Sequence, residues 1–264
     1  MTGNTSCWNK SVENSIQSPA QPDNSLWGLP SGHVHVWIWQ VGSTPLSPGE
    51  LATLDTRERN RAARFRPQLH RARWVRCHTG MRQILAGYLN CSPAEVAFRR
   101  GPNGKPRLHA PNPPTFNLSH SEDWCALAVA HSMEIGIDIQ TPHQVNPALW
   151  RRVLTPIEHA QMLQIAPYEQ DAAFFRCWTR KEAVGKADSQ GVYIHLKRTE
   201  TGLLPHASTP SAPSIIMAAN ASGIPQPWHL TDLTLPAGLF GALATAEPVI
   251  PDLRNPEQAG LTFP

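Results

Sequence analysis

Alternating apolar and polar positions predict several β-strands in this chain. Residues 33–41, HVHVWIWQV, are rich in β-branched and aromatic side chains and form the first expected strand. In residues 135–140, isoleucine alternates with Gly136, Asp138 and Gln140, so a strand there places its isoleucines on one face and its polar residues on the other. The remaining expected strands are residues 95–99, 116–119, 125–130, 193–198, 214–219, 228–235 and 240–246.

Apolar residues that recur every three to four positions predict the helices. The pattern is clearest from residue 69 to 89, where arginines occupy the opposite side and Asn90 and Pro93 follow as stop signals. Residues 47–50, SPGE, have the sequence of a capping box with proline at the first helical position, and they open a short helix that ends at Leu54. Further helices are expected at residues 147–154, 156–165 and 171–187.

The order of these elements suggests an α+β fold built from two similar lobes with a pseudo-twofold relation and the active site in the cleft between them. The first lobe is expected over residues 31–131 and the second over residues 132–248. Residues 1–30 are rich in Asn, Ser, Gln and Pro and are expected to be mobile. Residues 249–264 are expected to form a loosely held tail, and the proline-rich residues 204–213 a surface excursion.

Composition and charge limit the possible functions. A chain of 264 residues can build one large or two modest domains. The net charge of +3 is small, but nine arginines lie between Arg57 and Arg82, which favours a polyanionic ligand or an acidic partner. Five cysteines without a C-x-x-C pair argue against a disulfide framework or a structural zinc site and fit the reducing cytoplasm. Neither a membrane-spanning run nor a secretory signal is expected.

Residues 174–186, FFRCWTRKEAVGK, carry the most informative polar pattern. On a helix, Trp178, Glu182 and Lys186 recur at i, i+4 and i+8 and share one face, while Lys181 lies about 100° around the axis from Glu182. A Glu followed by Lys four residues later is also the ordinary pattern of a solvated helical ion pair. The helix alone therefore leaves a catalytic and a structural interpretation open.

The strand that contains Asp138 supplies a possible partner for this helix. Taken alone, Asp138 can equally be a hydrogen-bonded polar residue near a strand end. If the strand and the helix pack together, Asp138 and Glu182 form a two-carboxylate site for a hard cation. Lys181 and Lys186 are then left to hold phosphate.

Four short segments in a fixed order carry a family resemblance. They are residues 104–106 (GKP), 116–121 (FNLSHS), 136–139 (GIDI) and 178–186 (WTRKEAVGK). In this order and at these separations they resemble the 4′-phosphopantetheinyl transferases of the larger, surfactin-synthetase-activating type. The resemblance extends over residues 57–191 and implies the two-lobed fold of that family.

The resemblance implies a Mg²⁺-dependent reaction in which a serine of an apo acyl or peptidyl carrier protein receives the phosphopantetheine arm of coenzyme A, releasing adenosine 3′,5′-bisphosphate. Asp138 and Glu182 would be the metal ligands, and Glu182 also the general base. Lys186 would neutralise charge on the bridging and leaving oxygens, and Lys181 would add to that field. Gln140 stands where many members carry Glu, so it is expected to bind the cation weakly or through water. The family analogy implies a monomer.

The resemblance also assigns residues to the nucleotide end of coenzyme A. They are Arg57, Arg61, Arg73, Gly104, Lys105, Pro106, Ser119 and His120. The arginines and His120 would bind the ribose 3′-phosphate, Ser119 would contact coenzyme A beside His120, and the turn at residues 104–106 would border the adenine. Each has an ordinary alternative, because arginines often cover a solvated helix face, a histidine can be a surface residue and a turn lysine can be merely exposed.

Three other functions use some of the same features. A nucleic-acid-binding module would use the arginine cluster, but it should interleave aromatic residues with the basic ones. Another magnesium-dependent phosphate enzyme should show a phosphate-binding glycine loop, and neither G-x-x-x-x-G-K-[ST] nor G-x-G-x-x-G occurs. A carrier-binding relative with an impaired site would keep the fold, but Asp138, Glu182 and Lys186 are all present. No nucleic-acid or membrane partner is therefore expected.

Overall fold

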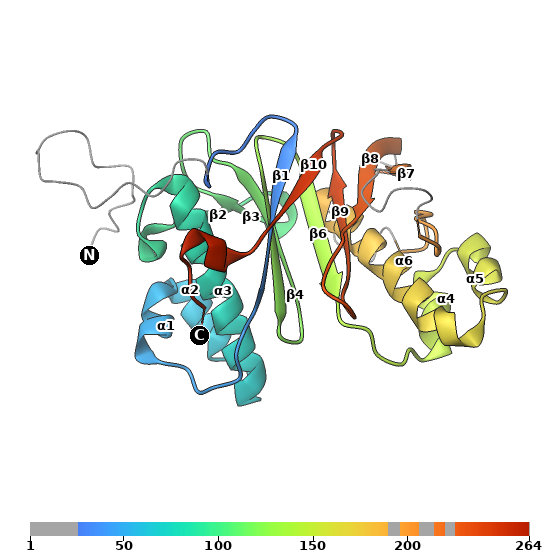
Figure 1. Cartoon of the computed structure of the whole chain (residues 1–264), viewed down its shortest axis with the longest axis horizontal. Coiled ribbons are helices and arrows are strands. Elements are labelled where there is room, and N and C mark those ends of the chain that lie inside the picture. Colours follow the sequence, from blue (N-terminus) through green and yellow to red (C-terminus); the bar gives the residue numbers. More distant parts are fainter. Residues whose placement is uncertain (1–25, 190–195, 206–213, 220–224, 264) are drawn as a thin grey trace, which may run out of the picture.

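The computed structural model describes residues 26–189, 196–205, 214–219 and 225–263, and Figure 1 labels its elements. The first half contains β1 (His33–Gln40), α1 (Pro48–Thr53), α2 (Thr56–Ala62), α3 (Gln68–Leu89), η1 (Pro93–Glu95), β2 (Phe98–Arg100), η2 (Pro102–Gly104), β3 (Pro106–Leu108), β4 (Thr115–Ser121) and β5 (Trp124–Ala130). The second half contains β6 (Ile135–Gln140), η3 (Pro147–Leu149), α4 (Trp150–Val153), α5 (Pro156–Met162), α6 (Pro167–Ala187), β7 (Ser214–Ala219), β8 (Pro225–Asp232), β9 (Phe240–Thr245), β10 (Ile250–Arg254) and η4 (Pro256–Ala259). Helices and strands are mixed throughout, so the fold is of the α+β class, as the sequence predicts.

The first sheet has the strand order β10-β1-β5-β4 and is buried on both faces. Its strands are antiparallel except for β10, which runs parallel to β1. One face packs against α3, where Trp37 and Leu127 share a buried cluster with Ile84 of the helix. Because side chains alternate along a strand, Val34 and Val36 point to the other face, which packs against the second sheet.

The second sheet is antiparallel, with the strand order β6-β9-β8-β7. Helix α6 covers one face of it, where Ala183 and Val184 pack with Trp228 and Leu230 (Figure 1). On the other face, Ile137 joins the apolar cluster shared with the first sheet. No helix within the described ranges is both long enough and apolar enough to cross a bilayer.

Side chains of β4 join the first sheet to the second. The backbone N–H groups of Ile137, Ile139 and Thr141 donate, in that order, to the side chains of Asn117, Ser119 and Ser121, at 2.9, 3.2 and 2.9 Å. These bonds satisfy one edge of β6, which would otherwise carry buried, unpaired donors. The alternating polar positions in residues 116–121 therefore have a structural role that the sequence pattern did not indicate.

Because Gly136 has no side chain, the backbone of α6 can pack directly against the backbone of β6. A Cβ atom added at Gly136 would lie 2.0 Å from the carbonyl oxygen of Ala183 and 2.4 Å from the backbone nitrogen of Ala187. Only glycine leaves room for the helix there. The close approach brings the side chains of Glu182 and Lys186 within reach of Asp138, two residues along β6.

We expect Gly136→Ala to lower the free energy of unfolding by about 1–3 kcal/mol, because the helix must move away from the strand. Urea unfolding monitored by circular dichroism measures this change. Gly49→Ala is the matched control: a Cβ there would meet only the Ser47 Oγ at 3.9 Å, and alanine favours a helix. Equal stability of the Gly136→Ala variant and the wild type would show that the helix does not depend on this contact.

The C-terminal segment differs from the loosely held tail predicted over residues 249–264. Residues Ile250–Arg254 form β10 and pair with β1. The Arg254 guanidinium also lies over the Trp37 ring, 5.7 Å from its centroid. Without β10, this part of β1 would present an unpaired edge. The first sheet thus takes strands from both ends of the chain, and the predicted boundary between the first lobe and the tail does not describe it.

Other elements also differ from the predictions. The helix predicted at residues 171–187 begins earlier, at Pro167, because proline suits the first turn. The strand predicted at residues 95–99 is partly replaced by η1, because Ser92 and Glu95 form a capping box there. Helix α2 was not predicted, since its seven residues are mostly polar and show no apolar period.

Three further predictions fall partly outside the described residues. The N-terminal segment predicted as mobile over residues 1–30 is described only from residue 26. The strand predicted at residues 193–198 is described only at residues 196–198, which form a turn instead. The surface excursion predicted at residues 204–213 is described only at its first two residues.

His35 makes the stability of the first sheet depend on pH. It is fully buried, and its Nδ1 lies 2.6 Å from the Tyr88 hydroxyl. Burial and then the positive charge of Arg254 lower its pKa from 6.5 to about 4. In the unfolded chain His35 binds its proton at the higher pKa of 6.5. The free energy of unfolding is therefore highest above pH 6.5, and it falls by about 3 kcal/mol as the pH decreases through 4.

We therefore expect His35→Gln to lose less stability than the wild type between pH 7 and pH 4. Urea unfolding at several pH values compares the two proteins. The control is their difference at pH 7, which records the cost of the substitution itself. An identical fall in the free energy of unfolding for both would mean that His35 does not carry this pH dependence.

Candidate functional site

Asp138 lies in the middle of β6 on the face that α6 covers, and only 5% of the residue is exposed. Its Oδ1 accepts hydrogen bonds from Ser119 Oγ at 2.8 Å and from Lys186 Nζ at 2.6 Å. Its Oδ2 is buried and has no hydrogen-bond partner among the residues that the structure describes. An unpaired buried carboxylate oxygen is costly. Oδ2 is therefore the atom of this group that most requires a ligand.

Lys186 links α6 to β6. Its Nζ donates to Asp138 Oδ1, to Ser119 Oγ at 3.0 Å and to the carbonyl oxygen of Ile137 at 3.0 Å. An ammonium group has three N–H donors, so these acceptors use all of them. Lys186 therefore holds Asp138 in position and adds positive charge beside it. For Lys186 to donate a hydrogen bond to a phosphate, one of these three contacts would have to break.

Glu182 lies one helical turn before Lys186 and is partly buried. Desolvation and then the negative charge of Asp138 raise the pKa of Glu182 from 4.5 to about 7, although Lys186 lowers it. Burial also raises the pKa of Asp138, an effect that Lys186 and Ser119 partly offset. The Lys186 ammonium does not fully offset the burial of these two carboxyl groups, so a bound cation would favour their ionised forms.

The available donors fit a small, hard cation. Asp138 Oδ2 and the Glu182 carboxylate are both oxygen donors, the type that Mg²⁺ prefers. The described ranges contain no cluster of three or more His, Cys, Asp or Glu side chains able to hold a metal. The cation would therefore take its remaining ligands from phosphate and water, as Mg²⁺ commonly does. Gln140 is partly buried, and strand alternation places it on the same face as Asp138.

Lys181 does not belong to this group, which corrects the prediction that it adds to a phosphate-binding field. It is fully buried, and its Nζ lies 2.6 Å from Glu158 Oε2 of α5. The Nζ also donates to the carbonyl oxygens of Leu196 and Thr199. Because Lys181 is rotated by about 100° from Glu182 on α6, its side chain is directed toward α5 rather than toward β6.

Two of the nine clustered arginines are structural. Arg76 is 1% exposed and its Nε lies 2.8 Å from Glu50 Oε1. Arg82 is fully buried and its Nε lies 2.7 Å from Glu58 Oε2. Their charges are neutralised inside the first half of the molecule. This reduces the basic surface that a nucleic-acid-binding module would need.

The three arginines predicted at the nucleotide end occupy different surroundings. Arg73 of α3 binds Glu122 at 2.6 Å and Asp123 at 2.7 Å, in the turn between β4 and β5. These contacts hold its guanidinium beside the end of β4, near the predicted phosphate histidine. Arg57 and Arg61 are exposed on α2. Nothing in their contacts separates them from an ordinary solvated helix face.

His120 ends up close to both α3 and α6. Its ring is exposed, yet desolvation by the surrounding protein lowers its pKa from 6.5, and the charges of Lys186 and then His78 lower it further. His78 of α3 stacks on Trp74 with ring centroids 3.8 Å apart, and its Nδ1 lies 3.0 Å from Glu58 Oε1. Sequence reasoning did not single out His78, because the helical period does not distinguish it from other polar positions of α3.

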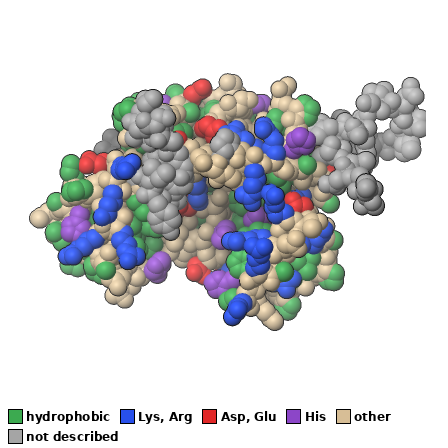
Figure 2. Space-filling model, turned by 180° about the vertical axis from the view of Figure 1, so that it is seen from behind, with side chains coloured by type: hydrophobic (Ala, Val, Ile, Leu, Met, Phe, Trp, Pro, Cys, Tyr) green, Lys and Arg blue, Asp and Glu red, His purple; other side chains and the backbone are tan. Residues whose placement is uncertain are grey.

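The surface between the two halves of the molecule is hollowed. Figure 2 shows this hollow from the side opposite to Figure 1, with Lys, Arg and His side chains along its border. A concave surface bordered by positive charge favours an anionic ligand.

Comparison with known proteins identifies the family. Residues 134–230 match the model of the 4′-phosphopantetheinyl transferase superfamily, and residues 47–132 match that of the 4′-phosphopantetheinyl transferase N-terminal region. The chain is 33% identical over 224 residues to the 4′-phosphopantetheinyl transferase HetI of Nostoc sp., which covers 83% of this chain and 90% of HetI. This chain belongs to the 4′-phosphopantetheinyl transferase superfamily. It is also 34% identical over 173 residues to the 4′-phosphopantetheinyl transferase AcpT of Salmonella typhi, covering 65% of this chain and 85% of AcpT.

In this member of the superfamily, the turn at residues 104–106 has a structural role. Gly104 has a φ of +83°, a left-handed conformation that glycine adopts without strain. Lys105 Nζ donates to Glu134 Oε2 at 3.2 Å, to the carbonyl oxygen of Ile135 at 2.8 Å and to that of Ala187 at 3.3 Å. Lys105 therefore attaches the turn to β6 and to the C-terminal end of α6, where a positive charge is favourable.

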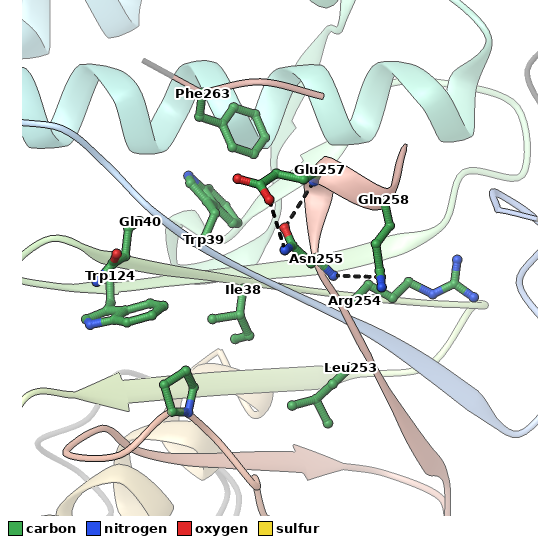
Figure 3. Close-up of a pocket in the computed structure, with 11 residues that line it drawn as sticks. Ile38, Trp39, Gln40, Trp124, Leu253, Arg254, Asn255, Glu257, Gln258 and Phe263 are labelled. Atoms are coloured by element: carbon green, nitrogen blue, oxygen red, sulfur yellow. Dashed lines mark hydrogen bonds between the residues drawn. The ribbon is translucent and has the colours of Figure 1, made fainter. Parts of the chain in front are cut away.

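A separate pocket of about 490 Å³ lies at the end of β1 in this transferase. Figure 3 shows Trp39 and Trp124 from the first sheet together with Arg254, Glu257 and Phe263 from the C-terminal segment around it. None of the residues around Asp138 lines this pocket. We therefore do not assign it to the candidate site.

Proposed function

We propose that the protein transfers the 4′-phosphopantetheine arm of coenzyme A to a serine of an apo acyl or peptidyl carrier protein, with Mg²⁺ as the metal ion. Membership of the transferase superfamily supports the reaction class. The main support for a metal ion is the buried Asp138 Oδ2, which has no hydrogen-bond partner among the described residues and whose carboxylate influences Glu182. The two four-stranded sheets, each with a long helix packed on it, support assignment to the larger, two-lobed type, which builds its site in one chain as a monomer.

In this proposal, Asp138 and Glu182 would hold the cation, which would supply positive charge to the pyrophosphate of coenzyme A. Lys186 keeps Asp138 ionised and oriented through its 2.6 Å contact with Oδ1. Arg73 and His120 bind the ribose 3′-phosphate in this proposal, and their common location near the end of β4 supports the assignment. The hollow between the two halves would hold the nucleotide.

Glu182 is the candidate general base. In this proposal the ionised Glu182 carboxylate takes the proton of the carrier serine hydroxyl. The serine oxygen forms a bond to the β-phosphorus, and the bond from that phosphorus to the bridging oxygen breaks. The electron pair leaves with adenosine 3′,5′-bisphosphate, and the phosphopantetheine arm remains on the carrier.

Intact mass spectrometry tests this function directly. The protein is incubated with coenzyme A, Mg²⁺ and a panel of apo carrier proteins from fatty-acid, polyketide and nonribosomal-peptide synthesis. We expect at least one carrier to gain the mass of one phosphopantetheine, and expect EDTA or Asp138→Ala to abolish the gain. A panel that stays unmodified, in parallel with a known transferase that modifies it, would contradict the proposal.

Replacing Gln140 by Glu is expected to lower the Mg²⁺ concentration for half-maximal rate by up to about tenfold, because a third carboxylate adds negative charge to the site. The rate is measured as a function of Mg²⁺ at saturating coenzyme A. Gln164→Glu introduces the same charge at an exposed position between α5 and α6 and serves as the control. An unchanged Mg²⁺ dependence in Gln140→Glu would show that residue 140 does not face the cation.

A further inference from the structure

The hydrogen bonds of Ser119 leave its hydroxyl no free capacity. A hydroxyl has one donor and two acceptor sites. Ser119 Oγ donates to Asp138 Oδ1 at 2.8 Å and accepts from Ile139 N at 3.2 Å and from Lys186 Nζ at 3.0 Å. A phosphate oxygen requires a donor, and the only hydroxyl proton of Ser119 is directed at the carboxylate.

The direction of β4 separates Ser119 from His120. Successive side chains of a strand point to opposite faces. Ser119 is 4% exposed and faces β6, whereas His120 is exposed and lies on the face of Phe116 and Leu118, which pack with the cluster beside α3. The two residues are neighbours in sequence, but they face different parts of the molecule.

We propose that Ser119 is a positioning residue, which holds the Asp138 carboxylate so that Oδ2 faces the cation, and that it is not a ligand of the ribose 3′-phosphate. The inference rests on the proposed function, because it concerns the same metal and the same nucleotide. Ser119 and Lys186 both bind Oδ1 and so fix the rotation of the carboxylate about its χ angles. Without Ser119, one of these two bonds is lost and Oδ2 is free to turn away.

The loss of a hydrogen-bond partner behind a metal ligand typically costs 10–100-fold in metal affinity. We therefore expect Ser119→Ala to raise the Mg²⁺ concentration for half-maximal rate by about 10–100-fold. The rate at saturating Mg²⁺ should recover most of the wild-type value, because Glu182 and the nucleotide contacts are unchanged. A ligand of the 3′-phosphate would instead affect the use of coenzyme A at every Mg²⁺ concentration.

Ser121→Ala is the matched control for Ser119→Ala. Ser121 Oγ also accepts a bond from a β6-edge backbone N–H, that of Thr141 at 2.9 Å, and Ser121 is likewise buried. It has no bond to Asp138. If the serine at 119 only joins the two sheets, both variants should change metal binding alike.

Two measurements decide the role of Ser119. Binding of Mn²⁺ in the presence of coenzyme A, followed by electron paramagnetic resonance, should weaken about 10–100-fold in Ser119→Ala and stay near the wild-type value in Ser121→Ala. The second measurement is the ratio of binding affinities for coenzyme A and 3′-dephospho-coenzyme A, each measured by calorimetry. This ratio should be unchanged in Ser119→Ala and should fall in His120→Ala.

Other results of these two measurements would contradict the proposed role of Ser119. A ratio that falls toward one in Ser119→Ala would make Ser119 a phosphate ligand, and equal weakening of Mn²⁺ binding in both serine variants would make its role structural. Unchanged Mn²⁺ binding in Ser119→Ala would also overturn the proposal. If the wild-type protein binds Mn²⁺ and coenzyme A but modifies no carrier, the proposed function fails while these comparisons still test Ser119.

Discussion

Glu182→Gln is expected to reduce phosphopantetheine transfer by at least about 10²–10⁴-fold, the contribution usual for a general base. The substitution also replaces a charged metal ligand by a neutral amide, so the Mg²⁺ requirement should rise as well. The measurement is the initial rate of holo-carrier formation over a range of Mg²⁺ concentrations. Saturating Mg²⁺ should not restore the rate, because the proton acceptor is missing.

Glu169→Gln is the matched control for this prediction. It makes the same chemical change in the same helix, at an exposed residue in the first turn of α6. The Glu182→Gln variant should also remain folded. The pKa of Glu182 is raised from 4.5 to about 7, so the wild-type fold loses stability as the pH rises from 4.5 through 7, and a neutral amide removes that loss. Near-normal transfer by a folded Glu182→Gln variant would refute both roles of this residue.

The second large effect concerns stability. Glu158→Gln is expected to lower the free energy of unfolding by about 3–5 kcal/mol, because it leaves the Lys181 ammonium buried without its charged partner. The two side chains are 0% and 1% exposed, with 2.6 Å between their charged atoms. Glu158 Oε1 also accepts a bond from Thr201 N at 2.8 Å, which secures the segment after α6. Urea unfolding at pH 7 measures the change.

A surface ion pair provides the comparison for Glu158→Gln. Glu122→Gln breaks the contact with Arg73, where the Glu122 side chain is 63% exposed, and should cost no more than about 1 kcal/mol. The double variant Glu158→Gln, Lys181→Met removes both buried charges and should recover much of the lost stability. A small effect of Glu158→Gln, similar to that of Glu122→Gln, would show that Lys181 finds another way to neutralise its charge.

The sequence was most informative where a regular period coincided with burial. The alternation of isoleucine with polar residues predicted a strand at residues 135–140, and β6 has these bounds. The 22-residue helix α3 was predicted almost to its ends, because a long amphipathic stretch gives many repeats of the same signal. Placing Asp138 and Glu182 on packed elements required the family motifs, since neither period indicates which elements meet.

The sequence was least informative about side-chain direction and about short elements paired over long distances. Lys181 and Lys186 both flank Glu182 in a predicted helix, but only the packing of α5 and β6 on different sides of α6 determines where each ammonium goes. Strand β10 contains Pro251 and no clear alternation, and its partner β1 is more than 200 residues away in the chain. Such pairings depend on tertiary context that local patterns do not carry.

The central claim is that Asp138 Oδ2 and the Glu182 carboxylate bind one divalent cation together with coenzyme A. A crystal structure of the protein grown with coenzyme A and Mg²⁺, supported by anomalous scattering from Mn²⁺ in place of Mg²⁺, tests it most directly. We predict one cation within about 2.0–2.3 Å of both side chains, with phosphate oxygens and water completing its coordination. A cation bound to the nucleotide without either carboxylate, or held by other residues of the chain, would contradict the claim.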